Sequence, residues 1–200
     1  MAEMQQLSKV CEEIFTGLPP RVKASPEADG VTTVPLVGIR AVTSEGFLDN
    51  QRLEEFSAGG VLPKSVRPLL PGDVLMTIRG SAPKTAIVES AFSKATFPSG
   101  NLAVLRPDQS KVVASYLWSF LSNVFRKDHH PLLTRASTQQ LSIRMSDLAR
   151  FEIPIAPLHK QRAIGEAALA LRNALIAQQK AATQGERTFV AFLAETFFKL

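Results

Sequence analysis

A regular apolar stripe near the C-terminus limits what this chain can fold into. Between Leu158 and Ala182, apolar and small residues recur in alternating steps of four and three, at Ile164, Ala168, Leu171, Leu175, Gln178 and Ala182. This spacing puts the residues on one side of an α-helix and is typical of a helix pair or a coiled coil. The alanines favour close approach of a second helix, whereas Gln178 weakens the stripe. The sequence therefore predicts a long helix with a seam for another helix.

A second apolar group follows this stripe. We expect Gln184 and Gly185 to interrupt the helix, because glycine is a poor helix former. Beyond them, helical spacing groups Phe189, Phe192, Leu193 and Phe197. This aromatic face needs a cover, which either the core of the same chain or a partner helix could supply.

The middle of the chain has the pattern of β-strands. Residues 74–79 alternate as a strand should, and Thr85–Val88 is the expected return strand of a hairpin that turns at Gly80–Pro83. Further strands are predicted over Val34–Ile39 and Leu102–Leu105.

Two shorter helices and an exposed turn complete the expected elements. Helical spacing predicts an amphipathic helix over residues 4–15 and a strongly apolar one over 110–126, with Ser110 as its N-cap. Trp118 falls outside the apolar stripe of the second helix and could be partly buried or part of an interface. Residues 97–101 are predicted to form an exposed turn.

Composition bounds the class of protein. Of the 200 residues, 45% are hydrophobic, which is enough for a sizeable core, and 23 Lys and Arg exceed 18 Asp and Glu by five charges. This basic excess is compatible with a polyanionic partner but does not prove one. The single cysteine, Cys11, forms no internal disulfide and is expected to be a small buried hydrophobe. With no signal-like or membrane-length apolar run, we expect a soluble cytoplasmic protein.

The residues that common enzymes need do not occur in recognisable patterns. Neither usual phosphate-binding glycine loop is present, and the three histidines, His129, His130 and His159, lack the spacing partners of a catalytic triad or a metal site. Asp73, Glu89 and Asp108 lie singly beside turns, where capping explains them. We therefore expect a binding protein rather than an enzyme, with no cofactor and no metal.

Several short motifs occur in an order that points to a family. They are Leu7–Ile14 followed by Gly17, Val34–Arg40, Leu-Leu-Pro-Gly-Asp-Val-Leu at 69–75, Asn101–Pro107, Ser-Thr-Gln-Gln-Leu-Ser-Ile at 137–143, and Ile-Pro-Ile-Ala-Pro-Leu at 153–158. In this order they resemble the specificity subunits of type I restriction-modification systems, in a form with one target-recognition domain. The chain departs from the family pattern at Lys160, where glutamate is usual, and at Ala136, where glycine is usual.

This resemblance implies an α+β fold: a mostly β target-recognition domain with packed helices over residues 1–155, then a long helical spacer or dimerisation region over 156–200. It also implies three partners, which are double-stranded DNA, an adenine methyltransferase (with a restriction subunit) and a second copy of the chain. Pairing of two copies through the helix would present two identical half-sites in opposite orientation.

The residue types agree with DNA binding. Glutamine amides can pair with adenine in the major groove, and basic side chains at loop tips can neutralise phosphates. The candidate DNA contacts are Arg40, Arg79, Lys84, Lys94, Asn101, Arg126, Lys127, Arg135, Ser137, Thr138, Gln139 and Gln140. The candidate dimer or partner contacts are Ile164, Ala168, Leu171 and Leu175. A second hypothesis is a structural or inhibitory protein that occupies a DNA methyltransferase without reading DNA.

Overall fold

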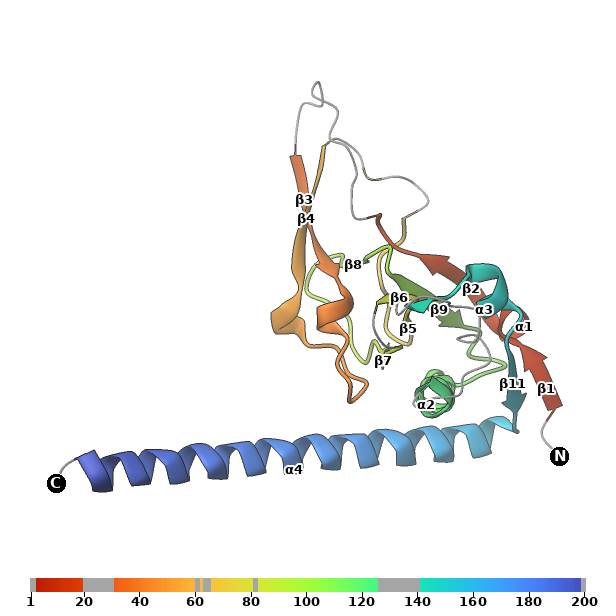
Figure 1. Ribbon diagram of the computed structural model, residues 1–200. Coiled ribbons are helices and arrows are strands. Elements are labelled where there is room, and N and C mark those ends of the chain that lie inside the picture. The colour runs from red at the N-terminus through yellow and green to blue at the C-terminus, as the bar shows by residue number, and fades with distance from the viewer. Residues whose placement is uncertain are drawn as a thin grey trace.

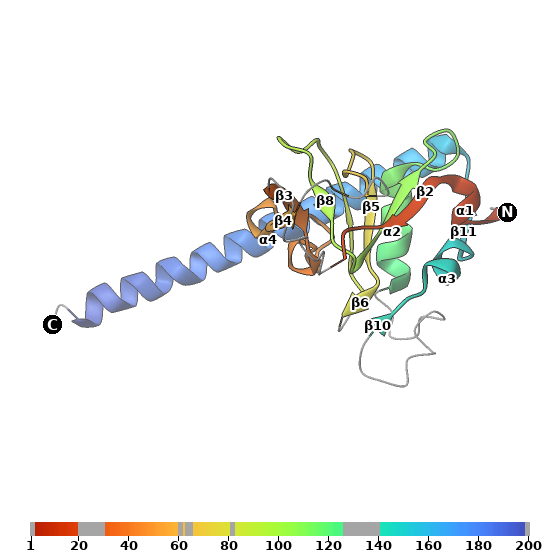
Figure 2. The same ribbon diagram turned by 90° about the horizontal axis from the view of Figure 1, so that it is seen from above.

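The elements that precede residue 158 form a β-rich unit, which lies along the N-terminal half of one long helix. The computed structural model describes residues 3–19, 31–59, 62, 66–80, 83–125 and 141–198. The long helix α4 (Leu158–Phe198) continues beyond the β-rich unit at its C-terminal end (Figure 1). Helix α2 (Ala114–Phe125) lies between the central sheet and α4, which it crosses steeply (Figures 1 and 2). The α+β class and the long C-terminal helix are as predicted.

The central sheet has four antiparallel strands in the order β2-β9-β5-β7. Their bounds are Cys11–Thr16 for β2, Leu102–Pro107 for β9, Val74–Thr77 for β5 and Thr85–Ile87 for β7. Val74 pairs with Ile87, which confirms the predicted hairpin, and β9 confirms the predicted strand at 102–105.

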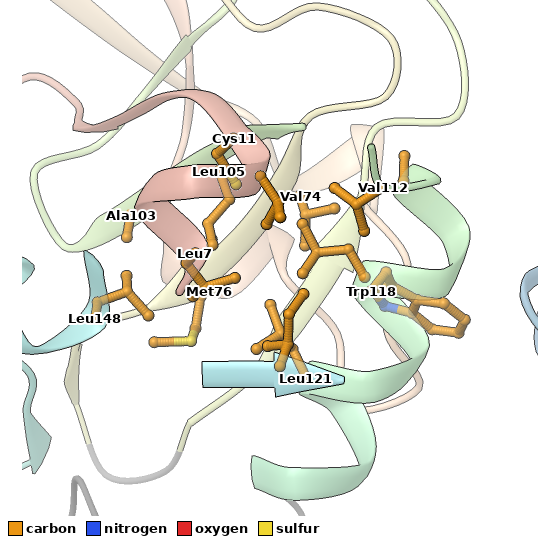
Figure 3. Close-up of a cluster of buried hydrophobic side chains, with 14 of the residues drawn as sticks. Leu7, Cys11, Val74, Met76, Ala103, Leu105, Val112, Trp118, Leu121 and Leu148 are labelled. Carbon is orange, nitrogen blue, oxygen red and sulfur yellow. The ribbon is translucent and has the colours of Figure 1, made fainter. Parts of the chain in front are cut away.

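Successive side chains of β5 point to opposite faces of the sheet and so contribute to two separate core clusters. Val74 and Met76 pack in one cluster with Leu121 of α2 (Figure 3). Leu75 points to the other face of the sheet, where it packs with Leu102 and Val104. All four residues of β5 are buried because both faces of this sheet are covered.

A second sheet has the order β4-β3-β8. Strand β3 (Val31–Val37) pairs antiparallel with β4 (Glu54–Gly59) and parallel with β8 (Phe97–Pro98). The short 3-10 helices η1 (Ile39–Ala41) and η2 (Asn50–Arg52) lie in the connection between β3 and β4. The turn predicted within 97–101 occurs at Gly100 and Asn101, but the prediction that this stretch is exposed was wrong. Phe97 packs against Leu18 and Leu36, and both Phe97 and Ser99 are buried.

The predicted helix over residues 4–15 was also wrong. Strand β1 (Glu3–Gln6) pairs with β11 (Glu152–Ile155), a single turn α1 (Leu7–Val10) follows, and β2 then joins the central sheet. Leu7 and Val10 are fully buried, so their helical spacing reflects that single turn alone. Pairing with strands from distant parts of the chain satisfies the flanking backbone and overrides the local pattern.

Two helix boundaries differ from prediction. Helix α2 begins at Ala114, and Ser110 instead donates its main-chain N–H to the carboxylate of Asp108 at 3.0 Å in the preceding turn. Helix α4 runs through Gln184 and Gly185 without the predicted interruption. One glycine costs about 1 kcal/mol in a helix interior, which a helix of 41 residues can absorb.

Candidate nucleic-acid and partner interface

Exposed Arg79 marks one edge of the candidate interface. It lies in β6 (Arg79–Gly80), which pairs with β10 (Leu141–Ser142) so that Arg79 stands opposite Ser142. The neighbouring Ile78 donates to the carbonyl of Asn101 at 2.9 Å and accepts from Ile143 at 3.0 Å. These bonds attach the strand that follows residues 126–140, and the helix α3 (Met145–Ala149) after it, to the core of the domain.

Seven of the predicted DNA contacts lie in the segment between α2 and β10. They are Arg126, Lys127, Arg135, Ser137, Thr138, Gln139 and Gln140, all of which lie outside the described residues. The structure therefore describes where this segment begins and ends, at Phe125 and Leu141.

Arg40 lies on η1, next to β6. A Cβ atom built on Gly80 would be 3.7 Å from the side chain of Ile39, so η1 lies beside β6. The Arg40 side chain is 81% exposed and reaches Glu54 at 3.4 Å, a weak surface ion pair. Its guanidinium is therefore available to an external anion.

Arg40 and Lys84 also line a common cleft of about 610 Å³. One wall is formed by the connection between β3 and β4, and the other by the middle of α4. Five cationic residues line it, Arg40, Arg52, Lys84, Lys180 and Arg187, together with the two acidic residues Glu45 and Asp49. Prediction from sequence assigned Arg40 and Lys84 to DNA and missed the basic residues of α4.

The two acidic residues of the cleft are already engaged. Asp49 forms an ion pair with Arg52 at 2.9 Å. Burial raises the pKa of Glu45, but the Ser44 hydroxyl, which donates to it at 2.8 Å, further hydrogen bonds and the charge of Lys84 outweigh this effect. The net pKa of Glu45 is lowered, so its carboxylate is charged at neutral pH.

Two other predicted contacts do not line this cleft. Lys94 is exposed, and its carbonyl accepts from the Thr96 hydroxyl at 3.0 Å. Asn101 is half-buried, and its carbonyl is the one that holds Ile78. Arg40 and Lys84 therefore line one cleft, to which Lys94 and Asn101 do not contribute.

The predicted seam of α4 is mostly uncovered. Ile164, Leu171 and Leu175 are 48%, 63% and 51% exposed. Ala168 is half-buried and packs against the core of its own chain. Leu171 and Leu175 border a hollow of about 480 Å³ that also touches Trp118 of α2.

A different side of α4 faces the β-rich unit. The amide of Gln161 is fully buried, where it accepts from Val113 N–H at 2.9 Å and donates to the carbonyls of Lys111 at 3.0 Å and Ala156 at 2.7 Å. One turn later Gly165 lies against the backbone of α2, where a Cβ atom would meet Ser115 and Tyr116. These contacts join the start of α4 to the start of α2.

Arg172 attaches α4 to the β-rich unit through contacts with three residues. Its side chain is 95% buried, donates to Glu89 at 2.8 Å and to the Gly46 carbonyl at 3.3 Å, and stacks over Trp118. The sequence left open whether Trp118 is buried or part of an interface, and the structure shows that it is buried. No local sequence signal could have identified this pairing, because the partners are 83 and 126 residues away from Arg172.

Two residues that the sequence assigned to structure rather than to chemistry are indeed structural. Asp73 is buried, accepts from Leu70 N–H and forms a bidentate ion pair with Arg106 at 2.8 and 2.9 Å. Burial raises the pKa of the Cys11 thiol to about 12, so it is neutral at physiological pH and unsuited to be a nucleophile.

The described residues contain no cluster of three His, Cys, Asp or Glu side chains with the geometry of a metal site. Within the described part of the chain, no helix is long and apolar enough to cross a bilayer.

A family model matches most of the chain. The model for the type I restriction modification DNA specificity domain matches residues 25–183. This chain belongs to that family. The specificity-domain match begins after β2 and covers the rest of the β-rich unit and most of α4, so these parts occur together in the family.

Individual relatives agree with the family assignment. The specificity chain is 23% identical over 168 residues to a protein of Methanocaldococcus jannaschii named as the MjaX specificity subunit of a type I restriction enzyme. The aligned region covers 82% of this chain and 38% of that relative. The chain therefore spans well under half the length of the curated relative.

Solved structures show the same fold. A chain from a study of complex assembly and conformational transition of the type I R-M system superposes with a TM-score of 0.65 at 21% identity. The HsdS subunit of Thermoanaerobacter tengcongensis gives a TM-score of 0.58 at 22% identity. These matches cover 95% and 90% of this specificity chain, and 43% and 39% of the solved chains.

Proposed function

We propose that this specificity chain recognises a DNA sequence and directs a partner adenine methyltransferase to it, with a restriction subunit in the same system. The observation that carries the proposal is the position of Arg40 and Arg79. Both are exposed; Arg79 lies in β6, which pairs with the strand that follows residues 126–140, and Arg40 lies on η1 beside β6. The proposal assigns binding to this chain and no catalytic step, and it places the chain in the cytoplasm with its DNA.

Within this proposal the contacts have two roles. Arg40, Arg79, Lys84 and Lys94, with Arg126, Lys127 and Arg135, neutralise phosphates and orient the domain on the duplex. Asn101 and the polar residues Ser137, Thr138, Gln139 and Gln140 supply the donors and acceptors that can distinguish base edges. Residues 1–155 form the recognition domain, and residues 156–200 form the spacer.

We further propose that two copies pair through α4. The exposed side chains of Ile164, Leu171 and Leu175 support this, because isolated apolar side chains are common on surfaces but a helical stripe of them is characteristic of an interface. A two-fold pair would present two identical half-sites in inverted orientation.

Selection from a pool of duplexes with random sequence tests the function. The chain, alone and with its methyltransferase, is expected to enrich a defined sequence at moderate salt. Gln139→Ala should relax the preference at one position, whereas Arg79→Ala should weaken binding to all sequences alike. If neither preparation enriches any sequence, the proposal is wrong.

The same experiment distinguishes our proposal from the second hypothesis, in which the chain binds a methyltransferase without reading DNA. That hypothesis expects the methyltransferase complex to survive replacement of Arg135 and Gln139 by alanine, with DNA affinity unchanged in both variants. Our proposal expects the complex to survive but DNA binding to weaken.

A further inference from the structure

We propose that the cleft between the β3–β4 connection and the middle of α4 is a second DNA contact, at which Lys180 and Arg187 bind backbone phosphates. This inference rests on the proposed function and adds a role for α4, which sequence analysis assigned to partners alone. The ligand class is the phosphate backbone of double-stranded DNA, and no base is read there.

The first support is the charge of the cleft. Lys180 and Arg187 are exposed, and among the residues that the structure describes no carboxylate forms an ion pair with either of them. Asp49 is neutralised by its ion pair with Arg52. Of the residues that line the cleft, Glu45 is then the one other acidic residue, against the four cations Arg40, Lys84, Lys180 and Arg187. A concave surface with this excess attracts polyanions.

The second support is a change of burial along one side of α4. Gln161, Gly165, Arg172 and Ile176 face the β-rich unit, and Gln179 and Thr183 continue the same stripe toward the C-terminus. Gln161, Gly165 and Arg172 are buried against this unit, whereas Gln179, Thr183 and the flanking cations Lys180 and Arg187 are exposed. Polar side chains and cations would be costly to bury against another apolar core, but they suit a hydrated phosphate backbone.

The third support is that the cleft and the dimer seam are on different sides of α4. At 3.6 residues per turn, Lys180 and Arg187 lie about 150° around the helix from the stripe of Ile164, Leu171 and Leu175. A second copy packed on the seam would therefore leave both cations uncovered. Protein partner and DNA can be bound at the same time.

Spacing favours a polymer over a single phosphate ion. Lys180 and Arg187 are seven residues apart, which is about 10 Å along the helix axis. Along the duplex axis one DNA strand carries a phosphate about every 3.4 Å, so the two cations are far enough apart to contact different phosphates. Arg40 also lines the cleft and its segment lies beside β6, so a duplex bound at Arg79 would continue across it.

The test compares two double variants that remove the same charge. Lys180→Ala with Arg187→Ala removes both cations that α4 contributes to the cleft. The control, Lys160→Ala with Arg162→Ala, removes two exposed cations from the other end of the same helix, where they do not line the cleft. Binding of a mixed-sequence DNA duplex is measured between about 50 and 200 mM salt, with helix content followed by circular dichroism.

We expect the slope of log K against log salt to become shallower by about 1 to 2 for the cleft variant and to stay unchanged for the control. The sequence enriched from a random pool should be the same for the cleft variant as for the wild type. Equal slopes for the two variants, or an altered sequence preference, would overturn the inference and leave the proposed function standing. A wild type without any DNA binding would instead overturn the proposed function, and this inference with it.

A second arm distinguishes DNA from a free phosphate ion. The chloride of the buffer is exchanged for inorganic phosphate at constant ionic strength. We expect the difference between the wild type and the cleft variant to persist, because each cation contacts a separate phosphate of the strand. If inorganic phosphate abolishes this difference, the cleft holds a single anion and the inference is wrong.

Discussion

The guanidinium of Arg172 lies 5.1 Å from the ring centre of Trp118, so a residue of α4 stacks directly on a residue of α2. The same guanidinium donates to Glu89 at 2.8 Å. This contact holds the middle of α4 against the β-rich unit. It therefore contributes to the direction in which the projecting part of the helix points.

Replacement of Arg172 by alanine is expected to destabilise the fold. The variant loses a charge-assisted hydrogen bond and a cation–π contact, together about 2 kcal/mol, a modest value because Glu89 is half-exposed. Urea unfolding measures the loss, with Arg162→Ala as an exposed control on the same helix. Arg172→Lys should restore only part of the stability, because an ammonium cannot maintain the same fork of hydrogen bonds. Equal stability of Arg172→Ala and the control would contradict this role.

Replacement by alanine should change the stability of the protein in opposite directions at two glycines of α4. Gly165→Ala introduces a methyl group against Ser115 and Tyr116, which should force α4 away from α2 and cost about 1–3 kcal/mol. Gly185→Ala meets nothing within 4 Å and should stabilise the helix by up to about 1 kcal/mol. Thermal unfolding of both variants checks the signs, and a stabilised Gly165→Ala would show that the helices do not approach this closely.

Charge on the seam is expected to separate the proposed dimer. Leu171→Glu with Leu175→Glu places two carboxylates where the second copy would pack, and the two residues are already exposed, so the fold should remain intact. Light scattering should report a monomer, with circular dichroism unchanged. The control is Ala163→Glu with Ala177→Glu, which adds the same charge to exposed positions away from the seam and should stay dimeric. A monomeric wild type would remove homodimerisation from the proposal and leave the seam to another partner.

Burial of Cys11 predicts a loss of stability at alkaline pH. Desolvation raises the pKa of its thiol to about 12 in the folded state, whereas an unfolded thiol titrates near about 8.5. The stability that the neutral thiol contributes is therefore complete below about pH 8.5 and is lost progressively up to pH 12. Above pH 9, urea unfolding of the wild type should lose about 1 kcal/mol per pH unit more than that of Cys11→Ala. Parallel pH profiles of the two proteins would show that the thiol is accessible to water.

Local pattern in the sequence was sufficient for several elements. The alternation at residues 74–79 with a turn before Thr85 predicts the β5–β7 hairpin, and period-3.6 spacing predicts α2 and α4. These elements follow from side-chain periodicity within a short window, which is a local property. The same periodicity placed Ile164, Leu171 and Leu175 on one side of α4, but only the structure shows that these side chains are exposed.

Long-range pairing decided what local pattern could not. The spacing of Leu7 and Val10 is helical, yet the strands on either side pair with residues about 90 and 150 positions away, which satisfies their backbone better than a helix would. Likewise Phe97 is buried only because β8 joins β3.

By itself the sequence determined the class of fold, the ordered motifs of the specificity family and the cations available for DNA. Only the tertiary structure brought Lys180 and Arg187 opposite Arg40 and Lys84, and set Arg172 between Trp118 and Glu89. The physical reason is that charge and periodicity are properties of single segments. A cleft or a buried ion pair depends on the relative positions of segments that no local pattern specifies.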